Sequence, residues 1–445
     1  MTPKAKRRLH IIALSIGALL ALLALLAIYI YAIGRDIPPA DFSDLALPAE
    51  EPISPEDNAY TYFRKAADAL IDSYTDENGE SVSLGQYLRK NRTHSVIIAK
   101  VLSDNHEALE YLQQGIQCQH CVFPVPMLTN FQGSCSLLDD VQVVLNMHYL
   151  MLYKIKHEHT SEKFDTAVHD VHALLRCGQL IRQNPNSLIV SLVGMSLGND
   201  ALLEAQRLVR NSKLSEYHLI QLLEYVDDTR SNDDSVRDTI KAEFQINIMG
   251  LKDKTTLIDQ CCLFGSSDSF FMGRHNFHPH RTQRDLANRY RSLISDIPKF
   301  YSDVTFRYNE PKELSLPSIF FVKNAIGKYL VSLHEEVMME VVERHLKTEG
   351  TIAATKIIIA CHLFQRETGR APQTLDELVP AYLPSVPLDP FDGKPFRYNP
   401  DLGVVYSVGK SLEDLGGITG SSQPIPPDDF SLIWRKKNAV FKIWE

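Results

Sequence analysis

The chain opens with a short basic segment followed by a long apolar run. Residues 11–34 carry no charged side chain, and as an α-helix these 24 residues would extend about 36 Å. That length is sufficient to cross a hydrocarbon core of about 30 Å. Tyr29 and Tyr31 lie near the end of the run, where aromatic rings favour the membrane interface, and four basic residues precede it: Lys4, Lys6, Arg7 and Arg8. The pattern predicts a transmembrane anchor with a cytoplasmic N-terminus. A cleaved signal peptide is the alternative, although no small-residue cleavage pattern follows Ala32.

After a spacer rich in Pro, Asp and Ala at residues 36–55, apolar residues recur mainly with the 3.6-residue period of α-helices. A first helix starts near residue 57. The further predicted helices cover residues 93–116, 137–156, 163–182, 187–210, 214–227, 233–251, 285–300 and 318–365. Short polar connections favour antiparallel neighbours, which predicts an α-hairpin or solenoid-like array. Residues 257–284 lack a clear period and form an irregular insert, and Gly327 and Gly350 are positions where the last helix can break.

The pattern changes after Gly369, which is expected to end the last long helix. Thr374 and Glu377 have the spacing of a capping box and predict a short helix. The residue patterns of 394–398 and 404–408 predict two strands, and residues 399–403 provide the turn of a β-hairpin. Because an isolated hairpin is marginally stable, we expect it to lie on the preceding helix.

These patterns predict a mainly α fold with an N-terminal transmembrane helix, a helical ectodomain and a small C-terminal α+β module with a β-hairpin. The predicted domains are a basic tail and anchor at 1–35, a spacer at 36–55, a helical ectodomain at 56–330, and a long helix with the hairpin module at 331–445. A chain of 445 residues suits about two to three domains.

Charge excludes one class of function. The first 35 residues carry five of the 46 basic residues and no acidic one, so the rest of the chain has 41 basic against 55 acidic residues. Nucleic-acid binding ordinarily needs a basic face, and no segment after the anchor is visibly basic enough. We therefore expect no nucleic-acid partner.

The C-terminal module carries a family resemblance. Residues 387–409 read PLDPFDGKPFRYNPDLGVVYSVG, between an LDELVP turn and a later Asp pair. This series resembles the C-terminal module of the major, G-type pseudopilins of type II secretion. Over its whole length the chain more loosely resembles a group of uncharacterised bacterial membrane proteins with a single anchor, common in planctomycetes, through CVFP at 121–124 and NPNSLIVSLVG at 184–194. That group implies no activity.

The pseudopilin resemblance implies a calcium site in the loop after the SVG strand. The matching carboxylates are Asp414, Asp428 and Asp429, whereas Lys410 and Ser411 replace the expected Pro and Asp. Calcium needs six to eight oxygen ligands, so the alternative is a Gly-rich turn in which the aspartates only cap and solvate the backbone. Asp389 and Asp392 precede Pro and Gly and are interpreted as turn residues rather than catalytic carboxylates.

Seven cysteines include a CQHC segment at 118–121. A structural disulfide that joins Cys118 or Cys121 to Cys135 is the preferred interpretation, and free thiols or a metal site are the alternatives. A cluster of His275, His278 and His280 near two cysteines, Cys261 and Cys262, could bind a transition metal or form a solvated loop. His169 and His172 share a helical face without a third ligand at a fixed spacing.

No Walker loop, dinucleotide fingerprint, Gly-x-Ser-x-Gly or HExxH motif occurs, so the sequence assigns no catalytic residue. We expect a single-pass protein of the bacterial inner membrane that exposes its ectodomain to the periplasm and binds an envelope protein. The alternatives are a secretion or pilus-assembly component with a calcium-stabilised loop, and a metal-dependent envelope enzyme.

Overall fold

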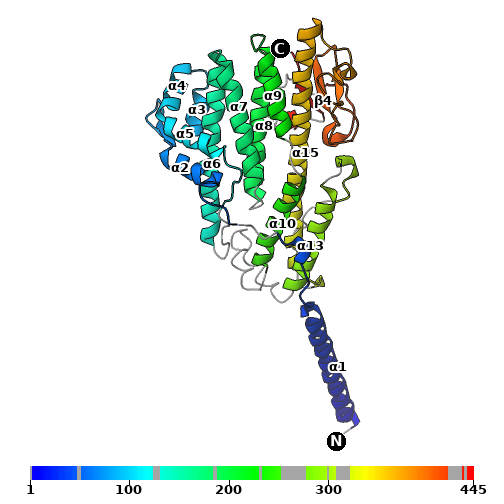
Figure 1. The fold of residues 1–445 in the computed structure, drawn as a ribbon. Coiled ribbons are helices and arrows are strands. Elements are labelled where there is room, and N and C mark those ends of the chain that lie inside the picture. The colour runs from blue at the N-terminus through cyan, green and yellow to red at the C-terminus, as the bar shows by residue number, and fades with distance from the viewer. Residues whose placement is uncertain are drawn as a thin grey trace. The chain divides into compact units, whose positions relative to one another are not determined.

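A computed structural model of the protein describes residues 3–47, 52–123, 131–183, 188–229, 233–251, 277–297, 300–306, 321–418, 433–434 and 438–444. These residues are mainly α-helical, as predicted, with two small antiparallel sheets (Figure 1). The α-helices are α1 Pro3–Gly34, α2 Ala59–Ala69, α3 Leu84–Lys90, α4 Ser95–Asp104, α5 His106–Gly115, α6 Phe131–Thr160, α7 Phe164–Arg182, α8 Leu188–Arg210, α9 Glu216–Asp228, α10 Asp233–Gly250, α13 Pro279–Asp296 and α15 Ala325–Thr368.

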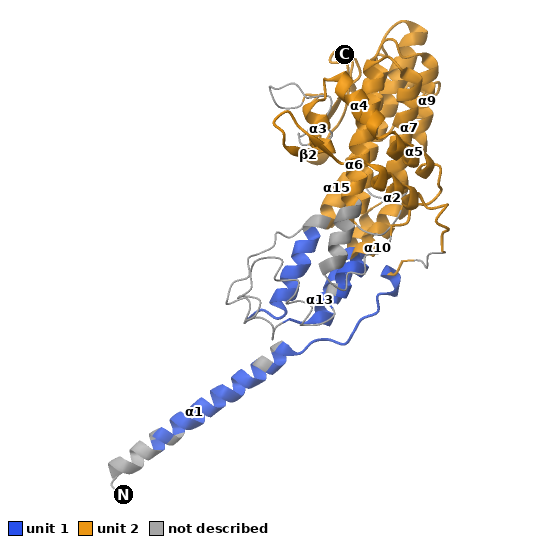
Figure 2. Cartoon of the chain, turned by 90° about the vertical axis from the view of Figure 1, so that its left-hand side faces the viewer, with its two compact units in different colours: residues 1–45, 244–291, 307–337 blue, residues 46–243, 292–306, 338–445 orange. Residues whose placement is uncertain are grey.

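The chain forms two compact units, each assembled from separated stretches (Figure 2). Unit 1 comprises residues 1–45, 244–291 and 307–337. Unit 2 comprises residues 46–243, 292–306 and 338–445. Such discontinuous units arise from contacts between distant stretches. The four consecutive domains expected along the sequence stay a prediction.

In unit 2, one predicted helix proves to be two. Residues 93–116 contain α4 and α5, which meet at Asn105. The Asn105 side chain is buried, accepts a hydrogen bond from the Ile71 N–H at 2.7 Å and donates one to the Tyr74 hydroxyl at 2.7 Å. A short polar side chain that bonds to neighbouring groups competes with helical hydrogen bonding, which explains the break. Residues 73–90 also contain elements that were not predicted: strands β1 Ser73–Thr75 and β2 Ser81–Ser83, and helix α3.

Helices α7 and α8 approach each other closely through glycines. A Cβ atom added to Gly178 would lie 2.7 Å from the Gly194 carbonyl oxygen and 2.8 Å from the Gly198 nitrogen. No side chain larger than hydrogen fits there without moving the backbone of one helix. This contact places α8 in the interior of unit 2, with Leu202 and Leu208 fully buried.

Helix α8 also contacts the part of α15 that belongs to unit 2. Asn199 donates a hydrogen bond to Thr348 at 2.9 Å, and Gln206 donates one to Thr355 at 2.8 Å. Both partners advance by seven residues, which is about two helical turns, so the two helices run in the same direction along this contact. The apolar neighbours of these residues exclude water and make each buried hydrogen bond costly to lose.

Helix α15 does not break at Gly350. Instead, the missing side chain makes room for Trp434, because a Cβ atom on Gly350 would lie 2.8 Å from Trp434 Cη2. The helix ends at Thr368, and Gly369 has a φ of +75°, as a C-terminal glycine should. The end of this helix was predicted correctly.

The C-terminal hairpin is confirmed, with shorter strands than predicted. Strand β3 Arg397–Asn399 pairs with β4 Val404–Ser407, and a third strand, β5 Ala439–Lys442, completes the antiparallel sheet on the other side of β4. The sheet lies on α15, as expected, because His362 Nε2 contacts the Ile443 carbonyl oxygen at 2.9 Å. The predicted short helix is a 3-10 turn at Leu375–Leu378, and the Glu377 carboxylate accepts the Thr374 N–H at 3.2 Å.

In unit 1, α13 begins six residues earlier than predicted. Its first turn is capped by Asp36, whose carboxylate accepts the backbone N–H groups of His280 at 2.8 Å and Arg281 at 3.1 Å. A carboxylate from outside the helix satisfies otherwise unpaired N–H groups and interacts favourably with the helix dipole. Residues 279–284 of the expected irregular insert are therefore helical, whereas residues 257–276 of the insert lie outside the described stretches.

Candidate functional site

Helix α1 exposes an apolar surface. Its 32 residues include leucines and isoleucines with 50–65% of their surface exposed, and Tyr31 is 72% exposed. An apolar stretch covers Leu14–Tyr29 of this helix. The stretch in α1 is shorter than a full membrane span. Among the described residues, α8 is the helix with the length and composition of a span, but two-thirds of its apolar window is buried inside the protein, as in a core helix. The exposed leucines of α1 have no such cover.

The end of α1 is fixed to unit 1 by polar contacts. Lys323 Nζ donates to the Ala32 carbonyl oxygen at 3.1 Å. This hydrogen bond satisfies one of the last four carbonyls of the helix, which have no partner within the helix. Asp36 then caps α13, and His280 Nδ1 contacts the Ile37 carbonyl oxygen at 2.9 Å. His280, a predicted metal ligand, therefore uses its Nδ1 for a contact with a backbone carbonyl at the end of α1. His278 is buried, and its backbone N–H donates to Asn324 at 3.0 Å.

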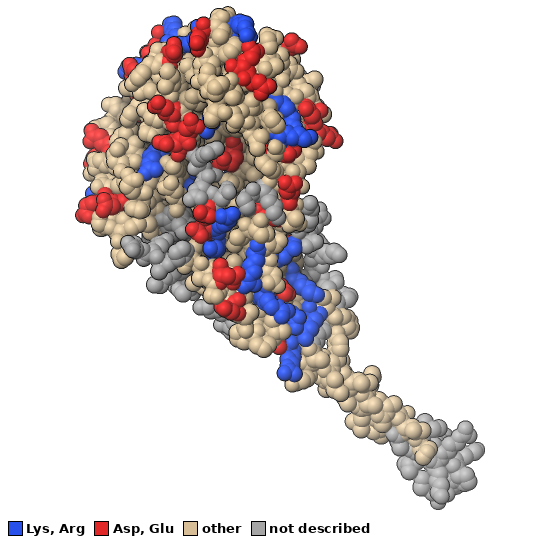
Figure 3. All heavy atoms as spheres, turned by 45° about the vertical axis from the view of Figure 1, so that its right-hand side comes forward, with Lys and Arg blue, Asp and Glu red and all other residues tan. Residues whose placement is uncertain are grey.

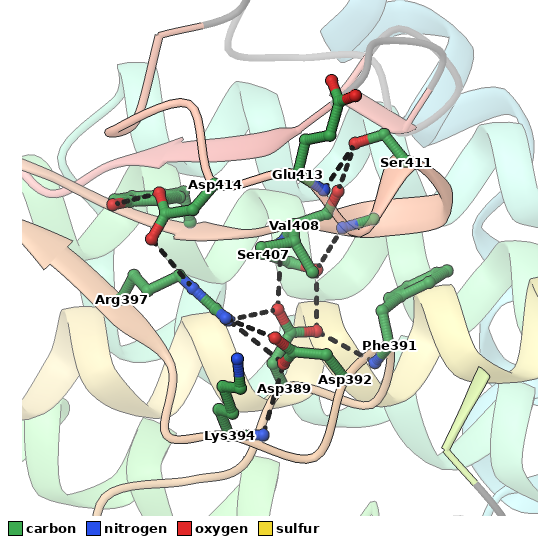
Figure 4. Close-up of polar contacts among 12 residues, drawn as sticks. Asp389, Phe391, Asp392, Lys394, Arg397, Ser407, Val408, Ser411, Glu413 and Asp414 are labelled. Carbon is green, nitrogen blue, oxygen red and sulfur yellow. Dashed lines mark hydrogen bonds and ion pairs between the residues drawn. The ribbon is translucent and has the colours of Figure 1, made fainter. Parts of the chain in front are cut away.

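A second polar cluster lies in the C-terminal module of unit 2, and we call it the Arg397 cluster (Figure 4). It consists of the Arg397 guanidinium and three carboxylates, from Asp389, Asp392 and Asp414. Nη1 of Arg397 lies 3.0 Å from Asp389 Oδ2 and 3.2 Å from Asp392 Oδ1, and Nη2 pairs with the other Asp392 oxygen. Nε lies 3.4 Å from Asp414 Oδ2. One cation therefore ties the DPFDG turn and the loop after β4 to strand β3.

Asp389 is the innermost member of the Arg397 cluster and is completely buried. Its carboxylate also accepts hydrogen bonds from the Phe391 N–H at 3.0 Å, the Ser407 hydroxyl at 2.8 Å and the Val408 N–H at 2.9 Å. Burial raises the pKa of Asp389, and these donors oppose the rise. Asp389 was interpreted as a turn residue, and it also organises the hairpin. Sequence reasoning missed Arg397, whose only signal is an arginine among three nearby aspartates.

Asp414, the first predicted calcium ligand, already has partners. One oxygen accepts the Tyr406 hydroxyl and the Gly416 N–H, both at 3.0 Å, and the other faces Arg397. The Gly416 N–H, with Tyr406 and Arg397, lowers the pKa of Asp414. Asp428 and Asp429 lie outside the described residues. No group of three or more His, Cys, Asp or Glu side chains suited to a metal is found in the described stretches, and the calcium site stays a prediction.

The predicted disulfide also stays a prediction. Cys118 is a buried free thiol, Cys121 is buried, and the Cys135 side chain is outside the described part of α6. Burial raises the pKa of Cys121 well above its usual range, and the nearby thiols of Cys177 and Cys118 add to this effect. Tertiary structure therefore gathers Cys118, Cys121 and Cys177, although Cys177 is distant in sequence. His275, Cys261 and Cys262 lie outside the described residues.

His169 and His172 line a polar cavity of about 400 Å³ with Arg176. The His172 ring stacks on Tyr225 at a centroid distance of 3.9 Å. Burial lowers the pKa of His172, and the neighbouring His169 contributes to that shift. The predicted shared face is present, and Arg176 and Asp228 lie beside it, but no group of three side chains suited to a metal is found here among the described residues.

A third polar cluster joins α6 to α7, and we call it the Lys154 cluster. Lys154 pairs with Asp170 and lies 3.5 Å from Glu158 Oε1, while Glu158 Oε2 is buried without a hydrogen-bond partner. Burial and a hydrogen bond with Asp170 raise the pKa of Glu158 to about 8. The cluster borders a cavity of about 340 Å³ lined by Lys154 and Asp170. Neither carboxylate was singled out from the sequence.

A larger cleft of about 680 Å³ runs beside α15 in unit 2. One wall is a face of α15 that includes Leu346, Glu349 and Ala353, and the other is the segment from Tyr382 to Pro390. Leu388 on that segment is 51% exposed. The mixed apolar and charged lining and the volume suit a small ligand or a few side chains of a partner protein.

Comparison with known proteins found no matching protein family, no similar curated protein and no solved structure with a matching fold.

Proposed function

We propose that this chain is a single-pass membrane protein anchored by α1, whose helical body lies outside the cytoplasm and binds another protein of the cell envelope. The bacterial inner membrane, the periplasmic body and the solenoid-like helical array are parts of this proposal. A binding role is favoured over catalysis because the polar clusters in the described part of the chain join structural elements to one another.

The observation that carries the proposal is the exposed apolar surface of α1. Fully burying an exposed leucine contributes roughly 1.5–3 kcal/mol, so the many leucines of α1 that are more than half exposed favour an apolar phase around the helix. The apolar run of 24 residues matches the thickness of a bilayer core, and the basic residues before it favour a cytoplasmic N-terminus. A long exposed apolar helix is otherwise an aggregation liability.

For the partner, the cleft beside α15 is the candidate surface. Exposed Leu388 on one wall and charged Glu349 on the other offer both contact area and orientation to a bound segment.

The anchor is tested by alkaline extraction and protease protection of the full chain in a bacterial host. We expect the protein to stay in the membrane fraction and the body to be cleaved only when the outer side of the inner membrane is accessible. Cleavage of the body from the cytoplasmic side would contradict the proposed topology, and release by alkaline extraction would contradict the anchor.

The partner surface is tested with a photo-crosslinking residue at Leu388 and, as the control, at Leu402, which is 53% exposed in the β3–β4 turn. A discrete adduct at position 388 that is absent at position 402 and is lost in Glu349→Lys supports the cleft. Equal labelling at both positions would contradict it.

A second proposal is a secretion or pilus-assembly component, which the helix, 3-10 turn and hairpin in their order along the C-terminal module favour. Calcium bound to the loop after β4 would raise the unfolding midpoint by mass action. Thermal unfolding of the full chain in detergent, followed by Trp emission with calcium and with chelator, tests this. An unchanged midpoint would contradict a calcium-stabilised loop.

A further inference from the structure

A short segment of unit 1 presents exposed apolar side chains next to the end of α1. Phe321 is 71% exposed and Val322 is 39% exposed, immediately before Lys323. Together with the exposed leucines and isoleucines of α1 they make a larger apolar surface, and large exposed apolar surfaces mark sites of interaction with membranes or proteins.

Phe321 and Lys323 contact the last turns of α1. The Phe321 and Tyr29 ring centroids lie 6.3 Å apart, and Lys323 Nζ lies 3.1 Å from the Ala32 carbonyl oxygen. Tyr29 and Ala32 fall within the last six residues of the apolar run, and about 20 residues suffice to cross the hydrocarbon core. If α1 spans the bilayer, its contact with Tyr29 holds Phe321 at the headgroup boundary, where aromatic rings are favoured.

Basic side chains surround the same junction. Figure 3 shows Lys and Arg side chains gathered where α1 joins the rest of unit 1. Those close to the junction in sequence or contact are Arg35 and Lys328, which are exposed, and Arg281, Arg284 and Lys323, which are half-buried. Of the nearby acids, Asp36 is used to cap α13, and Asp285 lies 4.0 Å from Arg284. The excess charge of this surface is positive, and it is continuous with the apolar surface of α1.

We propose that this surface binds the bilayer directly, with Phe321 and Val322 inserted among the headgroups and the basic side chains bound to anionic phospholipid headgroups. The inference rests on the proposed function, because it requires α1 in the membrane. A basic residue close to an anionic surface contributes about 1 kcal/mol, and an interfacial aromatic ring adds apolar burial. Together with Lys323 and Asp36 at the end of α1, the contact holds unit 1 in one orientation on the membrane.

The test uses tryptophan as a depth probe in the full chain reconstituted into liposomes. Both native tryptophans, Trp434 and Trp444, belong to unit 2 and give a constant background. The probes are Phe321→Trp at the proposed surface, Leu20→Trp in α1 as the anchor control, and Tyr217→Trp as the matched control, because Tyr217 is 63% exposed in unit 2. Quenching by brominated phospholipid is measured in phosphatidylcholine with and without phosphatidylglycerol.

We expect strong quenching of Leu20→Trp in both lipids, quenching of Phe321→Trp that increases at least twofold with phosphatidylglycerol, and no added quenching of Tyr217→Trp. Adding Lys323→Glu and Lys328→Glu to Phe321→Trp should remove the increase, as should high salt. If Leu20→Trp is quenched and Phe321→Trp behaves like Tyr217→Trp, the inference is overturned and the anchor stands. Quenching of Phe321→Trp without dependence on phosphatidylglycerol overturns the headgroup contact. An unquenched Leu20→Trp overturns the anchor and the inference together.

Discussion

The Arg397 and Lys154 clusters of unit 2 each place one cation beside a buried carboxylate, Asp389 or Glu158, but they stabilise that carboxylate differently. In the Arg397 cluster the buried Asp389 receives a guanidinium and three further donors. In the Lys154 cluster a single ammonium lies between Glu158 and Asp170, and one Glu158 oxygen has no donor. Burial, together with the neighbouring Asp170, raises the pKa of Glu158 to about 8.

Burial raises the pKa of both Asp389 and Glu158, and the difference lies in the three further donors that oppose the rise at Asp389. Arginine presents five N–H groups in a rigid plane, so Arg397 can serve three carboxylates at once. Lysine is a compact charge, and its two neighbouring acids also share a hydrogen bond with each other. When Glu158 is protonated, its own O–H can donate the hydrogen bond that it shares with Asp170. We therefore expect the Arg397 cluster to act mainly as a structural clamp and the Lys154 cluster to give the stronger response to pH.

The largest expected effect follows from removing the guanidinium. Arg397→Met should destabilise the C-terminal module by about 3 kcal/mol, because it leaves the buried Asp389 without its cation. Urea unfolding followed by Trp434 emission measures this directly, since Trp434 lies 5.3 Å from the Phe391 ring in the same module.

The control is Arg397→Lys, which keeps the charge and loses the planar geometry, and it should fall between Arg397→Met and the unchanged protein. A module as stable with methionine as with arginine would show that the donors to Asp389 suffice alone.

The second effect is a pH dependence at the Lys154 cluster. The folded pKa of Glu158, about 8, is above the unfolded value of 4.5, so its contribution to stability is complete below about pH 4.5 and is lost as the pH rises through 8. The slope can reach about 1.4 kcal/mol per pH unit. The experiment keeps the other charged or titratable groups around Glu158, namely Lys154, Asp170 and His169, so that only residue 158 differs. Glu158→Gln mimics the protonated acid and should flatten the stability profile between pH 5 and 8, measured by urea unfolding followed by circular dichroism.

Glu224→Gln on the exposed face of α9 is the matched control and should leave the profile unchanged. If the free energy of unfolding of Glu158→Gln falls with pH as steeply as that of the unchanged protein, another group causes the pH dependence. The two clusters would then not differ in the way proposed.

A smaller effect of opposite sign is expected from Asp414. Its folded pKa is lowered by the Gly416 N–H, Tyr406 and Arg397, so its contribution to stability is present above its usual pKa and is lost as the pH falls through the lowered folded pKa. Asp414→Asn should reduce the acid sensitivity of the C-terminal module by less than about 1 kcal/mol, because the Asp414 side chain is 54% exposed. Acid titration of Trp434 emission provides the measurement; an unaltered acid transition would exclude Asp414 as a contributor.

The smallest effect concerns the edge of the Arg397 cluster. Tyr406→Phe removes the hydroxyl that donates to Asp414 and should cost about 0.5 kcal/mol in urea unfolding. The Asp414→Asn/Tyr406→Phe double variant should cost less than the sum of the two single changes, because both remove the same hydrogen bond. Strict additivity would show that the two groups act independently.

Sequence patterns predicted the local structure well where a single stretch carries the signal. The helices around α6 to α10, the end of α15 at Gly369 and the β-hairpin follow from periodicity, a left-handed glycine and turn residues. The errors lie where a distant residue decides. Asn105 divides a predicted helix through contacts with Ile71 and Tyr74, and Asp36 starts α13 six residues early.

The polar clusters could be predicted only in part. Asp389, Asp392 and Asp414 were recognised as loop carboxylates, but their common partner Arg397 was not, because β-strand pairing and the DPFDG turn bring them together. Glu158 and Asp170 lie on different helices, and no spacing within either helix indicates their contact. The close approach of α7 and α8 had a weak sequence signal in Gly194 and Gly198, four residues apart.

The sequence by itself determined the helical fold class, the apolar run of α1 and the C-terminal hairpin, because helix and strand periods, caps and turns depend on neighbours along the chain. Only the tertiary structure decided the two discontinuous units, the cation shared by three aspartates, the unpaired oxygen of Glu158, and the position of Phe321 and Lys323 against the end of α1. Burial and partners are set by residues far apart in sequence, and they decide whether a carboxylate is a clamp, a proton acceptor or a helix cap.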